Sequence, residues 1–325
     1  YLYQFGAYIS PSELSVAKFL NSLPEETIQL MADTYVEGFR KGFEVMGRNL
    51  SKKKTVLIRY ELGFERMIRQ AVNGFRKLGL EPLFCRAPIS VINRNPSRKI
   101  GWFSTSPNKQ YDYDHRYDSA IYMGNTVKER KLSVMKATLE DLRTEASWYA
   151  GPAVVETFGE PGFTPENKDA CFALSGHQED VIRDFNNEFS QLMNHYVPEE
   201  ETSFTIIAFP RPEIGEPYED IFREVSRINT LDYEQYKGLQ QVLIDALDQA
   251  DYVEIKGKGE NCTDLRVMLH PLNNPEKETN FENCVADVNI PLGEVFTSPK
   301  LMGTNGILHV KSVYIGDFQF KNLKL

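Results

Sequence analysis

One glutamate in the C-terminal part of the sequence lies in a short apolar run between Pro-Leu-Gly and Ser-Pro. The run reads NIPLGEVFTSP over residues 289–299, with Glu294 between Leu292 and Val295. A stretch this apolar predicts burial, and an isolated buried carboxylate is costly unless it is paired, hydrogen-bonded or bound to a metal. We therefore expect Glu294 to face either a basic side chain or a divalent cation.

A second group of residues with metal-binding chemistry lies in QYDYDHRYD, residues 110–118. Asp112, Asp114, His115 and Asp118 offer three carboxylates and an imidazole, which are ligand types for calcium or zinc. The run lacks the glycine and the spacing of an EF-hand loop. We interpret it as a solvated loop that leads into a strand at DSAIYMG, residues 118–124.

A third candidate is the zinc-type ligand set Cys262, His270 and Cys284. Structural zinc sites usually pair ligands about two to four residues apart, and this set does not. The sequence also has no G-x-S-x-G elbow, no cysteine-nucleophile signature, no G-x-G-x-x-G and no P-loop. These absences weigh against serine or cysteine hydrolases and against a nucleotide-binding α/β protein.

The elements that position these residues begin with helices over residues 11–48. Ser10 before Pro11 is a helix cap followed by a first-turn proline, and Gly47 is a helix stop. One helical face carries Ile28, Met31, Tyr35, Phe39 and Phe43.

From residue 52 to about 230, apolar strands alternate with amphipathic helices. KKTVLIRY, LEPLFCRA, GPAVVETFG and SFTIIAFP read as strands, and the helix after the first of them ends at Gly79. This alternation predicts an open α/β sheet with mainly parallel strands and flanking helices. After a last long helix, YEQYKGLQQVLIDALDQA, short strands separated by Gly, Asn and Pro predict a β-rich region.

We therefore divide the chain into a helical N-terminal segment (1–50), an α/β domain (51–240) and a β-rich part (241–325). The sequence does not begin with methionine, and it stops at GDFQFKNLKL in what reads as mid-strand. We expect a segment of a longer protein.

The net charge of −9 argues against nucleic-acid binding and against adhesion to anionic membranes. No apolar run approaches the roughly 20 residues of a membrane span. The four cysteines, Cys85, Cys171, Cys262 and Cys284, are scattered, which indicates reduced thiols and a cytoplasmic location.

Three runs together resemble a known family: TDLRVML, NIPLGEVFTSP and GTNGILHV. They are similar to the thermophilic aminopeptidase family of dinuclear metallopeptidases, of the aminopeptidase T and aminopeptidase S type. The resemblance is strongest to its clostridial leucyl aminopeptidase-like members. The strand TIIAFPRPEIGE also resembles the family, whereas Cys262 stands where the family has glycine before Thr-Asp-Leu.

The resemblance implies a metal-dependent aminopeptidase in which Glu294 is a metal ligand and Val295 and Phe296 fix its direction. Two divalent metals (zinc, cobalt or manganese) would activate a water that attacks the first peptide bond of a peptide substrate. The remaining ligands and the catalytic residues would lie beyond Leu325, so this segment alone would be inactive. The resemblance favours a homodimer. The competing hypothesis is a non-catalytic binding or assembly module that keeps the fold.

Overall fold

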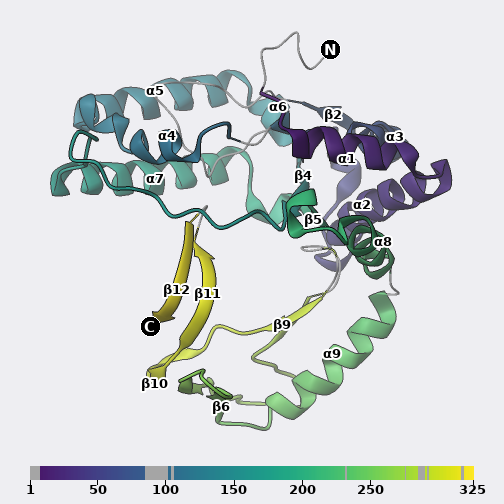
Figure 1. Ribbon diagram of the computed structural model, residues 1–325, viewed down its shortest axis with the longest axis vertical. Coiled ribbons are helices and arrows are strands. Elements are labelled where there is room, and N and C mark those ends of the chain that lie inside the picture. Colours follow the sequence, from purple (N-terminus) through teal and green to yellow (C-terminus); the bar gives the residue numbers. More distant parts are fainter. Residues whose placement is uncertain are drawn as a thin grey trace.

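The computed structural model describes residues 8–84, 102–103, 106–230, 233–274, 276–284, 290, 293–315 and 318–325. Cys85 lies outside these residues, and so do Asn289, Pro291 and Leu292 of the run that precedes Glu294. Figure 1 shows the α/β part above, with helices on both sides of it. The β-rich part and α9 lie below the α/β part in this view.

The first part is built on a parallel sheet. Its strands are β1 (Thr55–Glu61), β2 (Glu81–Leu83), β3 (Trp102–Phe103), β4 (Tyr149–Phe158) and β5 (Thr205–Pro210). The order is β2-β1-β4-β5 with β3 also beside β1, and each of these pairings is parallel. The predicted parallel α/β sheet is confirmed. Because β2 and β4 lie on opposite sides of β1, the direction of winding changes between β1 and β4.

Four helices pack with this sheet in one hydrophobic core: α1 (Pro11–Ser22), α2 (Glu25–Val45), α3 (Glu65–Lys77) and α8 (Tyr218–Asn229). Ser10 caps α1 through a capping box with Glu13. Gly47, at φ +63°, ends α2 with bonds from Gly47 N to Glu44 O and from Arg48 N to Phe43 O. Both predicted helix boundaries are confirmed.

The apolar face predicted for α2 is buried in this core. Ile28, Met31, Tyr35, Phe39 and Phe43 are each at most 2% exposed. Short 3₁₀ segments connect the main elements: η2 (Leu50–Lys52), η4 (Glu199–Glu201) and η5 (Pro212–Ile214).

A second helical group contains α4 (Lys109–Asp114), α5 (Asn125–Asp141), α6 (Arg143–Ser147) and α7 (Gly176–Tyr196). Of these, α4, α5 and α7 lie to the left in Figure 1. The strand predicted at 118–124 is wrong, because residues 118–121 form the 3₁₀ segment η3 (Asp118–Ile121). Local hydrogen bonds such as Met123 N to Ser119 O (2.8 Å) satisfy the backbone there, and Ile121 is 64% exposed. Part of the run 110–118, which the sequence predicted as a loop, is helical, because its first residues belong to α4. Asn108 caps this helix.

The C-terminal part consists of α9 (Tyr233–Leu247) and antiparallel strands, as the predicted β-rich region requires. One sheet has the order β10-β7-β6, with β6 (Tyr252–Lys256), β7 (Asp264–Met268) and β10 (Lys300–Ile307). The pair β11 (His309–Ile315) and β12 (Phe318–Lys324) forms a hairpin, and β8 (Glu282–Cys284) pairs with β9 (Glu294–Phe296). A small second core contains Ile244, Leu269 and Phe281.

None of the helices in the described residues combines the length and the apolar character that crossing a bilayer demands.

Candidate functional site

Glu294 is the first residue of β9, a three-residue strand that pairs antiparallel with β8. The register places Glu294 opposite Cys284, Val295 opposite Asn283, and Phe296 opposite Glu282. Successive side chains of a strand point to opposite faces. Glu294 therefore shares one face of this two-strand ribbon with Cys284, and Val295 shares the other with Asn283.

The inner face of the ribbon packs on the small C-terminal core and on α9. Val295 contacts the cluster of Ile244, Leu269 and Phe281. The side chain of Asn283 donates through Nδ2 to Lys237 O and to Gln241 Oε1, both at 3.1 Å. These contacts fix which face of the ribbon is turned inward.

The expectation that Glu294 is buried is wrong, because its side chain is exposed on the outer face. Strand β9 alternates between exposed and half-buried residues, so the single core contact of Val295 turns both of its neighbours outward. Phe296 is 47% exposed and packs on no core. Of the two residues expected to direct Glu294, Val295 does so and Phe296 does not.

The segment before Glu294 is anchored to the parallel sheet. Ile290 is 1% exposed and forms a parallel bridge to Ile207 of β5. Its carbonyl accepts from Ala208 N at 2.9 Å, and its amide donates to Ile206 O at 2.6 Å. Glu294 thus emerges four residues after the chain leaves the edge of the α/β sheet.

Because Gly293 has no side chain, the chain at this position can lie close to Gln240 of α9. Gly293 has φ +33°, and a Cβ built at this position would lie 2.8 Å from both Nε2 and Oε1 of Gln240. Gln240 itself donates to Cys284 O at 3.3 Å. A side chain at position 293 would displace the amide group of Gln240 and would also crowd the carbonyl oxygen of Cys284, which lies 3.0 Å from the same Cβ position.

The carboxylate of Glu294 makes no side-chain hydrogen bond or ion pair with the residues that the structure describes. A basic partner, the alternative expected from the sequence, is therefore absent from this part of the chain. An exposed carboxylate with both oxygens available is a good ligand for a divalent cation. Within the described ranges, however, no three His, Cys, Asp or Glu side chains are grouped closely enough to hold a metal.

The acidic run at 110–118 is occupied by partners from its own chain. Asp114 accepts from Lys168 Nζ at 2.7 Å and from Gln110 Nε2 at 2.6 Å. The hydrogen bond from Lys168 holds the pKa of Asp114 below its ordinary value. Asp112 accepts from the hydroxyl of Ser106, and Asp118 Oδ2 lies 2.8 Å from His115 Nδ1. These side chains brace a helical turn and do not converge on one point.

The zinc-type set Cys262, His270 and Cys284 is not brought together as a metal-holding group among the described residues. Cys262 lies in the turn before β7, where its amide donates to His309 Nδ1 at 3.0 Å. Cys171, Cys262 and Cys284 are all free of disulfides.

The structure also assembles a charged cluster that no sequence motif indicated. Glu61 ends β1, Glu160 follows β4, and Arg211 follows β5, so all three lie at the carboxyl edge of the parallel sheet. Arg211 Nη1 lies 2.7 Å from Glu61 Oε1 and 2.8 Å from Glu160 Oε1. Open α/β sheets commonly bind ligands at this edge, at the point where the winding changes direction.

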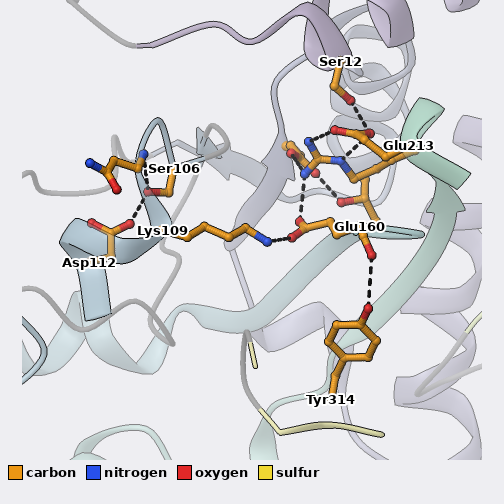
Figure 2. Close-up of polar contacts among 11 residues, drawn as sticks. Ser12, Ser106, Lys109, Asp112, Glu160, Glu213 and Tyr314 are labelled. Carbon is orange, nitrogen blue, oxygen red and sulfur yellow. Dashed lines mark hydrogen bonds and ion pairs between the residues drawn. The ribbon is translucent and has the colours of Figure 1, made fainter. Parts of the chain in front are cut away.

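This cluster is closed by its own partners, as Figure 2 shows. Glu213 lies 3.1 Å from Arg211 Nη2 and accepts from Ser12 Oγ at 2.6 Å. Lys109 Nζ of α4 lies 2.8 Å from Glu160 Oε2. Through Ser12 and Lys109 the cluster ties α1 and α4 to the sheet. Its sequence signal is a charged residue that ends a buried strand or directly follows one, as in VLIRYE and TIIAFPR.

A scan of protein-family models finds no match to this chain. A search of curated proteins finds none either. Among solved structures, the alignment with wild-type AmpT from Thermus thermophilus covers 92% of this chain and 68% of the AmpT chain. The TM-score is 0.47 and the sequence identity is 14%. A likeness this distant carries no argument about the activity of the chain.

Proposed function

We propose that this chain belongs to a metal-dependent aminopeptidase, in which Glu294 is a metal ligand and N-terminal amino acids are released from peptides. Two observations support the proposal. The runs TDLRVML, NIPLGEVFTSP and GTNGILHV resemble the thermophilic aminopeptidase family. The carboxylate of Glu294 is exposed and has no side-chain partner among the described residues. The first observation carries the proposal, and the second leaves the carboxylate accessible to a cation.

The donor set fits a divalent cation in part. Glu294 offers oxygen ligands, which zinc, cobalt and manganese all accept. Because the described residues hold no group of three ligands, the site requires further ligands from outside them. A pair of bound metals would supply a water of lowered pKa that is nucleophilic at neutral pH.

The contribution of this chain is to hold one carboxylate in place. Val295 inserts into the C-terminal core, Ile290 hydrogen-bonds to β5, and Gly293 admits Gln240 of α9. With these anchors the Glu294 side chain is presented outward, so binding a cation requires no burial of an unpaired charge. The substrate is a peptide with a free amino terminus, and the assembly is a homodimer.

The experiment compares the protein encoded by its natural gene with Glu294→Gln and with a matched control, Glu260→Gln. Glu260 is an exposed glutamate in the turn between β6 and β7. We expect Glu294→Gln to lower leucine release from a leucyl peptide by more than about 100-fold, with loss of bound metal and an unchanged fold. Glu260→Gln should retain both activity and metal.

Near-wild-type activity and metal content in Glu294→Gln would remove Glu294 from the site. If the unmodified protein releases no leucine with zinc, cobalt or manganese present, the competing hypothesis of a non-catalytic binding or assembly module is favoured.

A further inference from the structure

The residue directly opposite Glu294 on the neighbouring strand is Cys284, and the geometry points to a role for it. We infer that the Cys284 thiolate binds the same metal ion as Glu294. This inference rests on the proposed function, and it adds a sulfur ligand to a site for which the sequence indicated one carboxylate.

The strand register carries this inference. In the antiparallel pair β8–β9, the Cα partner of Glu294 is Cys284. Side chains of directly opposed residues project from the same face, with Cβ atoms about 4.5–5.5 Å apart. Zinc binds carboxylate oxygen at about 2.0–2.2 Å and thiolate sulfur at about 2.3 Å. One ion on the outer face of the ribbon can therefore contact both side chains with the backbone as it stands.

The surroundings of the ribbon favour this face as the metal side. Asn283 and Val295, the pair next to Cys284 and Glu294, are turned inward to α9 and the small core. Gln240 holds the carbonyl of Cys284 from α9. Cys284 is half-buried and Glu294 is exposed, so a cation can approach the pair from solvent.

The donor chemistry then selects the metal. Binding requires the thiol to lose its proton, so that Cys284-SH and a divalent cation give a metal–thiolate bond and one released proton. Thiolate ligands suit zinc and cobalt, whereas manganese and magnesium prefer oxygen ligands. Of the metals that the family resemblance allows, zinc or cobalt would be preferred over manganese. Metal affinity should fall as the pH is lowered, because protons compete for the sulfur.

The test loads the metal-free protein with cobalt(II) and records the near-ultraviolet absorption band that arises from charge transfer between thiolate and cobalt. Four variants are compared with the unmodified protein: Cys284→Ser, Cys284→Ala, Glu294→Gln and the control Cys262→Ser. Cys262 is an exposed cysteine in the turn before β7. We expect the band in the unmodified protein and in Cys262→Ser, and we expect both Cys284 variants to lose it. The Cys284 variants should also bind cobalt at least about tenfold more weakly.

A second measurement needs no variant. Alkylation of the native protein is followed at each cysteine by peptide mapping, with and without zinc. Zinc should slow the modification of Cys284 and leave that of Cys262 unchanged.

The outcomes separate this inference from the proposed function. Two results would overturn the role of Cys284 and leave Glu294 as a ligand, provided that Glu294→Gln loses cobalt. The first is that the unmodified protein shows no thiolate band, and the second is that Cys284→Ser keeps the band. If neither Glu294→Gln nor the Cys284 variants change the bound cobalt, both the inference and the proposed function fail.

Discussion

At the scale of single residues, the buried ion cluster around Arg211 contributes to stability through geometry more than through charge. The Arg211 and Glu61 side chains are only 2% and 4% exposed. Removing one partner from such a pair leaves an uncompensated buried charge, whereas the intact pair gains little over an apolar substitute. The cluster therefore fixes how α1 and α4 meet the sheet.

We expect Arg211→Met to lower the free energy of unfolding by about 3–5 kcal/mol, because it removes the Arg211 cation from the buried Glu61 carboxylate. The matched control is Arg223→Met on α8, whose partners Glu219 and Asp220 are more than half exposed. Loss of such a surface pair should change stability by about 0–1 kcal/mol. Urea unfolding of both variants checks this, and equal effects would contradict a central role for Arg211.

The same cluster predicts a loss of stability in acid. Burial raises the pKa of Glu213, but the hydrogen bond from Ser12, a backbone hydrogen bond and Arg211 together outweigh it. The net pKa lies below the ordinary value of 4.5. A carboxyl group whose pKa is lower in the folded state contributes stability at pH values above its unfolded pKa. That contribution should begin to decline below about pH 4.5 and should be lost as the pH falls through the lower folded pKa.

Urea unfolding of Glu213→Gln across this acid range measures the contribution. We expect the stability of the variant to fall less steeply with decreasing pH than that of the unmodified protein. A slope equal to that of the unmodified protein would show that Glu213 is not coupled to folding.

At the scale of elements, the connection between the parallel sheet and the β8–β9 ribbon depends on Ile290. It is 1% exposed and belongs to the main core, whereas β8 and β9, the strands before and after it in sequence, pair with each other in the C-terminal part. Ile290→Ala should cost about 2–5 kcal/mol, since it leaves a cavity at the edge of β5. The control Leu301→Ala removes a side chain that is 84% exposed and should change stability by less than about 0.5 kcal/mol.

Thermal unfolding and metal affinity of both variants test this connection. We expect Ile290→Ala to weaken metal binding as well as stability, because Glu294 lies four residues downstream. Unchanged metal affinity in a destabilised Ile290→Ala protein would show that the bridge to β5 does not position the ribbon.

Elements with strong local signals were predictable from the sequence. The cap at Ser10, the stop at Gly47 and the apolar face of α2 all depend on residues within a few positions of one another. The alternation of strands and helices likewise indicated the parallel sheet. The segment 118–124 was not predictable in this way, since Ile121 faces solvent and local hydrogen bonds form a 3₁₀ turn.

The candidate site was predictable only in part, because its geometry depends on long-range pairing. An apolar run indicated burial of Glu294, yet one core contact at Val295 turns the glutamate outward. The opposition of Cys284 and Glu294 arises from the register of the strands β8 and β9. No spacing along the chain encodes that register, and the same holds for the meeting of Glu61, Glu160 and Arg211. The division at residues 50 and 240 stays a prediction.

At the scale of the whole molecule, the described residues present at most a partial metal site. Glu294 and Cys284 supply two ligands where catalytic zinc sites take about three from protein. We therefore expect the polypeptide of residues 1–325, purified alone, to release no leucine from a leucyl peptide in the presence of zinc, cobalt or manganese. Robust turnover by this polypeptide would show that its own residues complete the site.

The central claim is that the carboxylate of Glu294 binds a divalent metal, and the location of the ion tests it most directly. Crystals of the protein encoded by its natural gene are soaked in zinc, and the ion is located by its anomalous scattering. We predict a zinc peak about 2.0–2.2 Å from a carboxylate oxygen of Glu294. A zinc-loaded crystal in which Glu294 instead pairs with a lysine or arginine, or contacts solvent alone, would contradict the account.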